Sequence, residues 1–367
     1  MVHVTRTTRP SLTTAGAEPR AALIRSMIAR ALRTPSVDNT QPWRLAVDGA
    51  TIHIDVDTAR ARHGVIGGFA GLIALGAFAE SLRLEASGHG FPSILVVDET
   101  RDVPSVRVML GQGACADTEL ASELEGRHTN RGPYGAAPLF AEETARLAAE
   151  GTRSAPLHVK RARREIEEVA SASALAEQVR FDETDPSDLF RWLRWKARDA
   201  TATRDGLDTR LLGLARHERW ALRMTGSPSA TWCLRRLGGG RLAGRRLHHE
   251  VLASGAVGAI SIADLRPESF IDCGRAMLRV WLRASKLGLA FAPVTVGAML
   301  PLSRRFGGSF SRCANRKLDE ASAALGRTFG IEAGHSVAFL FRVGVPLVTP
   351  TLRSERRPLS NFMGDPS

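Results

Sequence analysis

Two arginines with a hydroxyl between them stand near the middle of the chain, in the sequence RHTNR that begins at Arg127 and ends at Arg131. Guanidinium groups are planar forks of donors that match a phosphate, and the hydroxyl of Thr129 adds a neutral donor. This pattern is typical of a phosphate site. Taken alone it is more often a solvated polar turn, because Gly132 and Pro133 follow it directly.

A second stretch, TPSVDNTQPWRLAVDG, combines rigid backbone with hydrogen-bonding side chains. Its polar positions are Ser36, Asn39 and Gln41, and prolines stand at both ends of the polar part. A plain connector needs neither feature, so we interpret this loop as one held in shape to grip a ligand. The other interpretation is a helix stop followed by a hairpin entry, with Trp43 packed in the core.

A third cluster of cations lies near the end of the chain, in RSERRPL, where Arg356 and Arg357 precede Pro358. The formal net charge is +12, and arginine carries nearly all of the positive charge. A basic protein of this kind suits nucleic acid or an anionic cofactor. The arginines are scattered and form no basic helix, so nucleic acid is the weaker partner, and surface arginine bias stays open as an explanation.

Composition and cysteine spacing exclude several classes of protein. The chain has 367 residues, 44% of them hydrophobic, which allows one large globular domain or two smaller ones. Its cysteines are too far apart for a zinc site or a disulfide framework, which favours a reducing cytoplasm. No apolar stretch approaches the roughly 20 residues that a membrane-spanning helix needs. We therefore expect no metal and no membrane partner, and a frayed tail over residues 1–19.

Hydrophobic periodicity predicts the elements that position these clusters. We expect an amphipathic helix at 20–33, a hairpin of WRLAV and TIHIDV around Asp48-Gly49, and a glycine-rich helix at about 71–87. Strands are predicted at 93–98, 105–110, 157–162, 256–263 and 336–346, and a buried helix ends near Gly288. A long helical region is expected at about 188–250, with a mobile loop at 235–246.

The two halves of the chain also repeat a pattern of small residues. Gly76, Leu84, Ala86, Ser87 and Gly90 recur, at the same spacing, as Gly274, Leu282, Ala284, Ser285 and Gly288. This predicts two equivalent buried helices, each closed by a C-terminal glycine. We infer two fused units, the first at 20–120 and the second at 121–367, packed against each other as the subunits of a dimer would pack.

Together the polar loop, the R-x-T-x-R cluster and the C-terminal RRPL resemble the flavin-binding nitroreductase family, and specifically its Acg-type branch of long single-chain actinobacterial members. The resemblance covers the chain from about Arg20 to Met363. It implies an α+β, nitroreductase-like fold, with an antiparallel or mixed sheet core flanked by helices and built from two fused pseudo-symmetric units.

The resemblance also implies a role for individual residues. The polar loop would reach a bound FMN from the partner side, the arginine clusters would hold its phosphate, Arg131 would lie near the flavin pyrimidine, and two backbone amides would face N5 and O4. These expected FMN contacts are Pro35, Ser36, Asn39 and Gln41 for the loop, Arg127, Thr129, Arg356 and Arg357 for the phosphate, and Thr295 and Val296 for the amides.

These implications lead to one expected function and one alternative. A single FMN would lie between the two halves of a monomer that acts as an internal pseudo-dimer. The protein would be a cytoplasmic oxidoreductase that passes hydride from NAD(P)H through flavin N5 to an unknown acceptor. The alternative is an FMN-storing protein in which the helical region at 188–250 covers the flavin like a lid.

Overall fold

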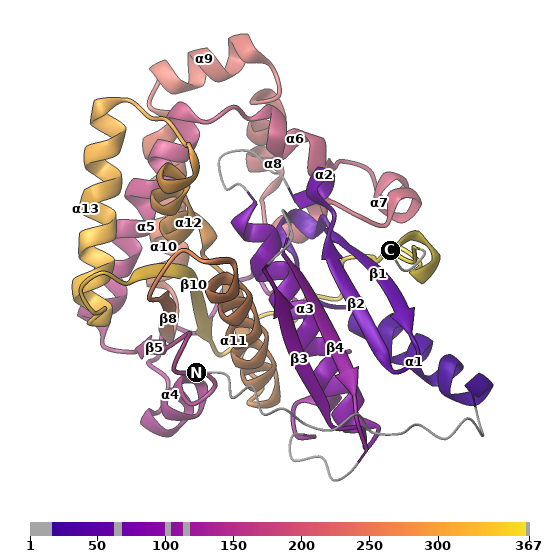
Figure 1. Ribbon diagram of the computed structural model, residues 1–367. Helices are drawn as coiled ribbons and strands as arrows, with labels where there is room; N and C mark the ends of the chain where they lie inside the picture. Colours follow the sequence, from indigo (N-terminus) through magenta and orange to yellow (C-terminus); the bar gives the residue numbers. More distant parts are fainter. Residues whose placement is uncertain (1–16, 62–67, 100–103, 113–117, 365–367) are drawn as a thin grey trace.

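The computed structural model describes residues 17–61, 68–99, 104–112 and 118–364 (Figure 1). The predicted tail at 1–19 lies outside these residues up to position 16, and Cys115 also lies outside them. The first helix, α1 (Ala17–Ala31), begins three residues before the predicted start. Among the described helices, none is long and apolar enough to span a bilayer.

The first half of the chain forms a four-stranded antiparallel sheet. Its strands are β1 (Trp43–Asp48), β2 (Thr51–Val56), β3 (Ser93–Asp98) and β4 (Ser105–Leu110), in the order β1-β2-β4-β3. The predicted hairpin is confirmed, because Asp48 pairs with Thr51 and Gly49 takes a positive φ of 54°. The long helix α3 (Phe69–Gly88) packs with α1 and this sheet around one hydrophobic core.

The second half forms a sheet of the same design. Its strands are β5 (Leu157–Lys160), β8 (Ala256–Ile262), β9 (Ala290–Pro293) and β10 (Ser336–Gly344), in the order β5-β8-β10-β9. All of its strand pairs are antiparallel. Along the chain, the helix α11 (Pro267–Lys286) comes between β8 and β9, just as α3 comes between β2 and β3. The α+β class and the antiparallel sheets are therefore confirmed, and the two halves are consistent with two fused units.

The two central helices, α3 and α11, lie side by side in the middle of the molecule (Figure 1). A methyl group on Gly76 would collide with the main-chain carbonyl of Ile271, and one on Gly274 would collide with that of Ile73. The contact is reciprocal. Each glycine lies against the carbonyl of the residue that comes three positions before the other glycine. These are the glycines that open the predicted repeat.

The second unit differs from the first by a long insertion between β5 and β8, where β1 and β2 are joined by a short turn. The insertion includes α5 (Arg163–Glu183), α6 (Ser187–Trp192), α7 (Ala197–Thr203), α8 (Arg216–Met224), α9 (Pro228–Arg236) and α10 (Gly239–Leu252). Within the insertion, the short strands β6 (Leu193–Arg194) and β7 (Leu207–Asp208) pair in parallel.

The mobile loop predicted at 235–246 is wrong, because this segment is mostly helical. Gly238 makes the turn between α9 and α10 with a φ of 83°. Gly240 and Gly244 face α5, where a methyl group would meet the carboxylate of Asp182 or the carbonyl of Ala174. The glycines therefore serve close helix packing and not mobility.

The remaining helices are short or flank the second sheet. They are α2 (Thr58–Ala61), α4 (Ala141–Ala148), α12 (Thr295–Ser303), α13 (Arg312–Phe329) and the 3₁₀ turns η1 (Val37–Asn39), η3 (Ala121–Glu123), η4 (Thr209–Leu212), η5 (Arg304–Phe306) and η6 (Leu359–Asn361). After β10 the chain returns to the first unit, where Phe362 accepts a main-chain hydrogen bond from Leu45. This return brings the C-terminal arginines to the polar loop.

Candidate functional site

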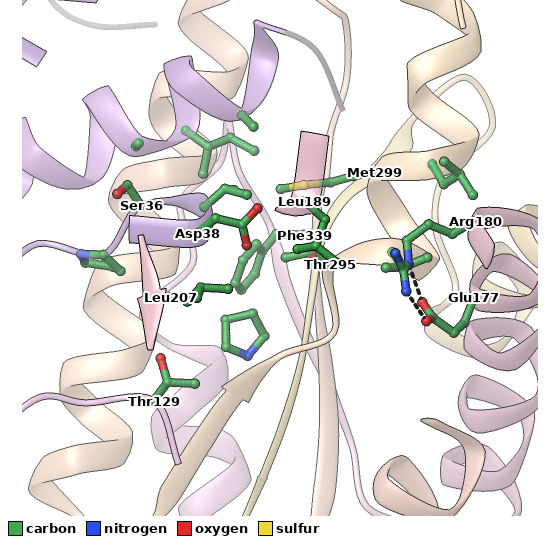
Figure 2. Close-up of a pocket in the computed structure, with 18 of the residues that line it drawn as sticks. Ser36, Asp38, Thr129, Glu177, Arg180, Leu189, Leu207, Thr295, Met299 and Phe339 are labelled. Atoms are coloured by element: carbon green, nitrogen blue, oxygen red, sulfur yellow. Dashed lines mark hydrogen bonds and ion pairs between the residues drawn. The ribbon is translucent and has the colours of Figure 1, made fainter. Parts of the chain in front are cut away.

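A cavity of about 430 Å³ lies where the two units and the insertion meet. The first unit contributes the polar loop at 35–38 and α3, and the second contributes α11 and the start of α12. The insertion covers it with Pro186, Leu189, Leu207 and Leu212. Figure 2 shows Asp38, Leu207, Phe339 and Thr295 converging on this space. Its lining is mainly apolar, which suits a flat aromatic ligand.

A smaller cavity of about 70 Å³ adjoins the first one. The two share lining residues, among them Pro35, Ser36, Thr129 and Arg131. Five arginines line the smaller cavity, namely Arg33, Arg127, Arg131, Arg353 and Arg356. The combined site is therefore an apolar chamber with a strongly cationic annex.

Two of these arginines are held in place by main-chain carbonyls. Arg127 donates to the carbonyl of Arg33 at 2.9 Å, and Arg356 donates to the same oxygen at 3.2 Å. The guanidinium of Arg127 also lies 4.5 Å from the ring centroid of Trp281. Within the described part of the chain, neither Arg127 nor Arg356 forms an ion pair with a carboxylate.

Arginines outnumber carboxylates in this annex, where Asp38 is the one carboxylate among the described lining residues. Burial lowers the pKa of Arg127 well below its usual range, and the positive charges of Arg356, Arg33 and Arg353 lower it further. Burial and the neighbouring Arg33 lower the pKa of Arg356 to about 9. Because five arginines face one carboxylate here, a bound anion would relieve both the desolvation and the repulsion of Arg127 and Arg356.

The polar loop has an unusual backbone. Asp38, Asn39 and Gln41 have φ values of 49°, 56° and 51°, in the left-handed region that side chains other than glycine rarely adopt. Hydrogen bonds hold this conformation. Ser36 Oγ accepts from the Gln41 amide at 2.9 Å, and Asn39 Nδ2 donates to the carbonyl of Glu355 at 3.1 Å.

Gln41 joins the loop to two distant segments. It is completely buried, donates to the carbonyl of Arg204 in the insertion at 2.9 Å, and accepts from the main-chain amide of Arg357 at 3.0 Å. Asn39 lines the small cavity, and its buried Oδ1 finds no hydrogen-bond donor among the described residues. The loop therefore offers an unused acceptor beside the arginines.

Thr295 and Val296 are the first two residues of α12, and both line the large cavity. The amides of a first helical turn have no partner within their own helix. The preceding residue, Val294, provides no side-chain cap. A ligand in the cavity can therefore be met by unpaired N–H groups at this end.

The structure brings together most of the residues predicted to bind a cofactor. Pro35, Ser36, Thr129, Arg131, Thr295 and Val296 line the large cavity, and Asn39, Arg127 and Arg356 line the small one. Gln41 and Arg357 line neither of these cavities in the described structure. The Arg357 guanidinium lies 4.8 Å from the ring centroid of Phe362. The main-chain amide of Arg357 contacts the loop, where it donates to Gln41.

The sequence analysis did not predict the apolar residues that line the large cavity, nor the ion pair that α5 contributes to it. Met277, Trp281, Met299 and Phe339 come from core segments, and nothing in their local sequence distinguishes lining from packing. Arg180 on α5 donates to Glu177 at 2.8 Å, and both face the cavity (Figure 2). Their i, i+3 spacing on a helix was the available signal, but it is common on solvated helices.

Comparisons with known proteins give distant similarities. No protein-family model matches the chain. An uncharacterized protein of Mycobacterium tuberculosis is 27% identical over 295 residues, which are 77% of this chain and 40% of that protein. The chain thus spans about two-fifths of the length of this curated relative.

The chain also aligns with solved nitroreductases. An FMN-dependent nitroreductase of Mycobacterium smegmatis, in complex with NADPH, is 14% identical over 66% of this chain and 96% of its own, with a TM-score of 0.39. A nitroreductase with bound FMN from Bacteroides fragilis is 13% identical over 66% of this chain and 95% of its own, with a TM-score of 0.37. Similarity at this level leaves the chemistry of the site to be argued from the chain's own residues.

Proposed function

We propose that this chain binds one FMN between its two units and is a nitroreductase-like oxidoreductase of the Acg type. The observation that carries the proposal is the pairing of a mainly apolar cavity with an adjoining cavity in which five arginines outnumber one carboxylate. A ring system and a phosphate joined by a short chain match these two compartments in polarity. The nitroreductases with bound FMN or NADPH named above are in keeping with it.

The residues present fit the phosphate end of such a cofactor. Arg127 would donate to the phosphate, with Thr129 as a neutral donor, and the positive charge of Arg356 would attract it. Asn39 Oδ1, the buried acceptor without a donor, would receive a hydroxyl of the sugar-like chain. Gln41 and the main chain of Arg357 would position the loop without touching the ligand.

The ring end would be held in the larger cavity. Arg131, which lines both cavities, would lie beside the ring and stabilise negative charge there. The first amides of α12, at Thr295 and Val296, would face its polar edge. Bound FMN would supply a two-electron carrier at N5, able to take hydride from NAD(P)H and pass electrons to a second substrate. The chain supplies orientation, charge and exclusion of water.

A storage role is the second candidate, and the insertion favours it. Pro186, Leu189, Leu207 and Leu212 cover the cavity. The loop is bonded to the same insertion through Gln41 and the carbonyl of Arg204. A cover tied to the binding loop in this way would keep NAD(P)H from the ring.

One experiment tests both candidates in sequence. The purified protein should carry a chromophore absorbing near 450 nm, which acid should release as FMN. Addition of NADPH without oxygen should bleach it if the protein is a reductase, whereas persistent colour would favour storage. A colourless protein that ignores added FMN would refute both. Gel filtration should give a monomer, because one chain provides both sides of the site.

A further inference from the structure

The helices α8, α9 and α10 carry large apolar side chains that face solvent. Trp220 is 66% exposed, Trp232 60%, Leu237 83% and Leu242 71%. In Figure 1, α9 forms the top edge of the molecule. These side chains lie outside the cavity described above, so the proposed cofactor gives them no role.

The exposed residues follow helical spacing, so each helix presents one outward face. On α9 and its cap this face holds Trp232, Cys233, Arg236 and Leu237. On α10 it holds Arg241, Leu242, Arg245 and His249. The opposite side of α10 is fixed against α5 by Gly240 and Gly244. Close packing on one side thus directs the apolar and cationic side chains outward on the other.

The charge of this surface has one sign. Exposed arginines accompany the apolar groups, at positions Arg216, Arg223, Arg236, Arg241 and Arg245. The helices α8, α9 and α10 contain two carboxylates, Glu218 and Glu250. Both are paired with Arg246 and do not offset the exposed cations. We name the outward faces of α8, α9 and α10 the cationic apolar surface.

We propose that the cationic apolar surface docks the protein on an anionic lipid bilayer. Tryptophan rings settle at the boundary between headgroups and acyl chains, with leucine below them, while arginines reach the lipid phosphates. Each arginine near a negatively charged membrane adds attraction that salt screens. A peripheral contact of this kind needs no membrane-spanning segment. The expectation of no membrane partner was based on the lack of such a segment and therefore did not address this contact.

Other occupants fit the surface less well. A second copy in a symmetric contact would bring the arginines against one another, because the same patch serves both partners. Nucleic acid would pair with arginines and stack on tryptophans, but it would leave Leu237 and Leu242 without an apolar partner. A bilayer satisfies the cations and the aliphatic groups together.

The test uses vesicle flotation of the full protein. It should float with vesicles of phosphatidylcholine mixed with phosphatidylglycerol and stay in the bulk with phosphatidylcholine alone. The double variant W232S/L237S should lower the bound fraction at least tenfold, and R236E/R241E should abolish it. A matched control, Phe140→Ser, removes an equally exposed aromatic group elsewhere and should bind as wild type. Tryptophan emission should shift to the blue when wild type or Phe140→Ser is mixed with the anionic vesicles, and not with either double variant.

Three results would overturn the proposal. The first is wild-type protein that ignores the anionic vesicles. The second is binding that survives both double variants while their circular dichroism is native. The third is salt-sensitive binding of a DNA or RNA oligonucleotide, lost in R236E/R241E, without any flotation, which would assign the surface to nucleic acid.

Discussion

Arg127 and Arg356 come from opposite ends of the second unit and donate to one carbonyl oxygen, that of Arg33. Arg33 lies two residues after the end of α1 in the first unit, so a single acceptor from one unit aligns two cations from the other. Arg356 also donates to the carbonyls of Leu32, Thr34, Ser354 and Glu355, so main-chain oxygens engage its Nε, Nη1 and Nη2. Among the described residues, Arg127 makes one side-chain hydrogen bond and keeps N–H groups for the small cavity. These main-chain contacts explain why the cationic annex exists before any ligand arrives.

The two adjacent C-terminal arginines should have different effects on cofactor binding. Arg356 faces the small cavity, whereas the side chain of Arg357 packs on Phe362. We expect loss of the Arg356 charge to cost about as much as loss of a charge-assisted hydrogen bond, about 1.5–3 kcal/mol, so Arg356→Ala should weaken FMN binding about tenfold to a hundredfold. Arg357→Ala should bind FMN as wild type does. Equal losses in both variants, measured by fluorescence titration, would refute the distinction.

The reciprocal glycine contact predicts a large loss of stability on adding one methyl group. Gly76→Ala or Gly274→Ala would force the backbones of α3 and α11 apart, and overpacking of this kind costs about 1–3 kcal/mol or more. Gly326→Ala is the matched control, because Gly326 lies on α13 with open space around it. The control should gain up to about 1 kcal/mol. Urea unfolding gives all three values.

Glu80 predicts how stability depends on pH. It is fully buried on α3 and accepts hydrogen bonds from Arg83, Arg275 and Arg279. Burial alone would raise its pKa, but the three arginines outweigh burial and lower the pKa from 4.5 to about 2. The stabilisation is therefore complete above pH 4.5 and is lost as the pH falls towards 2.

The measurement for Glu80 compares wild type with Glu80→Gln. The shift corresponds to roughly 3 kcal/mol. The difference in free energy of unfolding should be constant from pH 6 to about 5 and should shrink below pH 4.5. A difference that does not change between pH 6 and 3 would show that Glu80 is not held ionised by its arginines.

Gln41 should act as a positioning residue. In Gln41→Leu, the carbonyl of Arg204 and the main-chain amide of Arg357 lose their part-buried hydrogen bonds, and each unsatisfied group costs up to about 1–3 kcal/mol. We expect lower stability together with weaker FMN binding, although Gln41 does not line the cavities. Gln178→Leu, which removes the half-buried partner of Lys317, should change neither by much. Unchanged FMN affinity in Gln41→Leu would remove the positioning role.

Much of the fold could be predicted where local sequence and tertiary environment agree. The hairpin at Asp48-Gly49, the buried strand β8 and the helix that ends before Gly288 are examples. The glycines near 240 misled the prediction, because glycine allows both a mobile loop and a close helix contact. Only the position of α5 decides between these, and α5 is distant in the chain.

The candidate site divides in the same way. Its polar residues were recognisable because three motifs, the polar loop, R-x-T-x-R and RRPL, occur in one chain, although each alone also suits an ordinary turn. The difference between Arg356 and Arg357 could not be predicted from the sequence, since it depends on the packing of the Arg357 side chain on Phe362. The apolar lining of Met277 and Phe339 could not be told from ordinary core until the two units were placed together.

The central claim is that the arginine-lined cavity holds the phosphate of FMN. Titrations of the protein with FMN and with riboflavin, which lacks the phosphate, test it most directly. Wild type should prefer FMN by about a hundredfold or more, and Arg356→Ala should lose most of that preference while Arg357→Ala retains it. Equal affinity of wild type for the two flavins would contradict the claim.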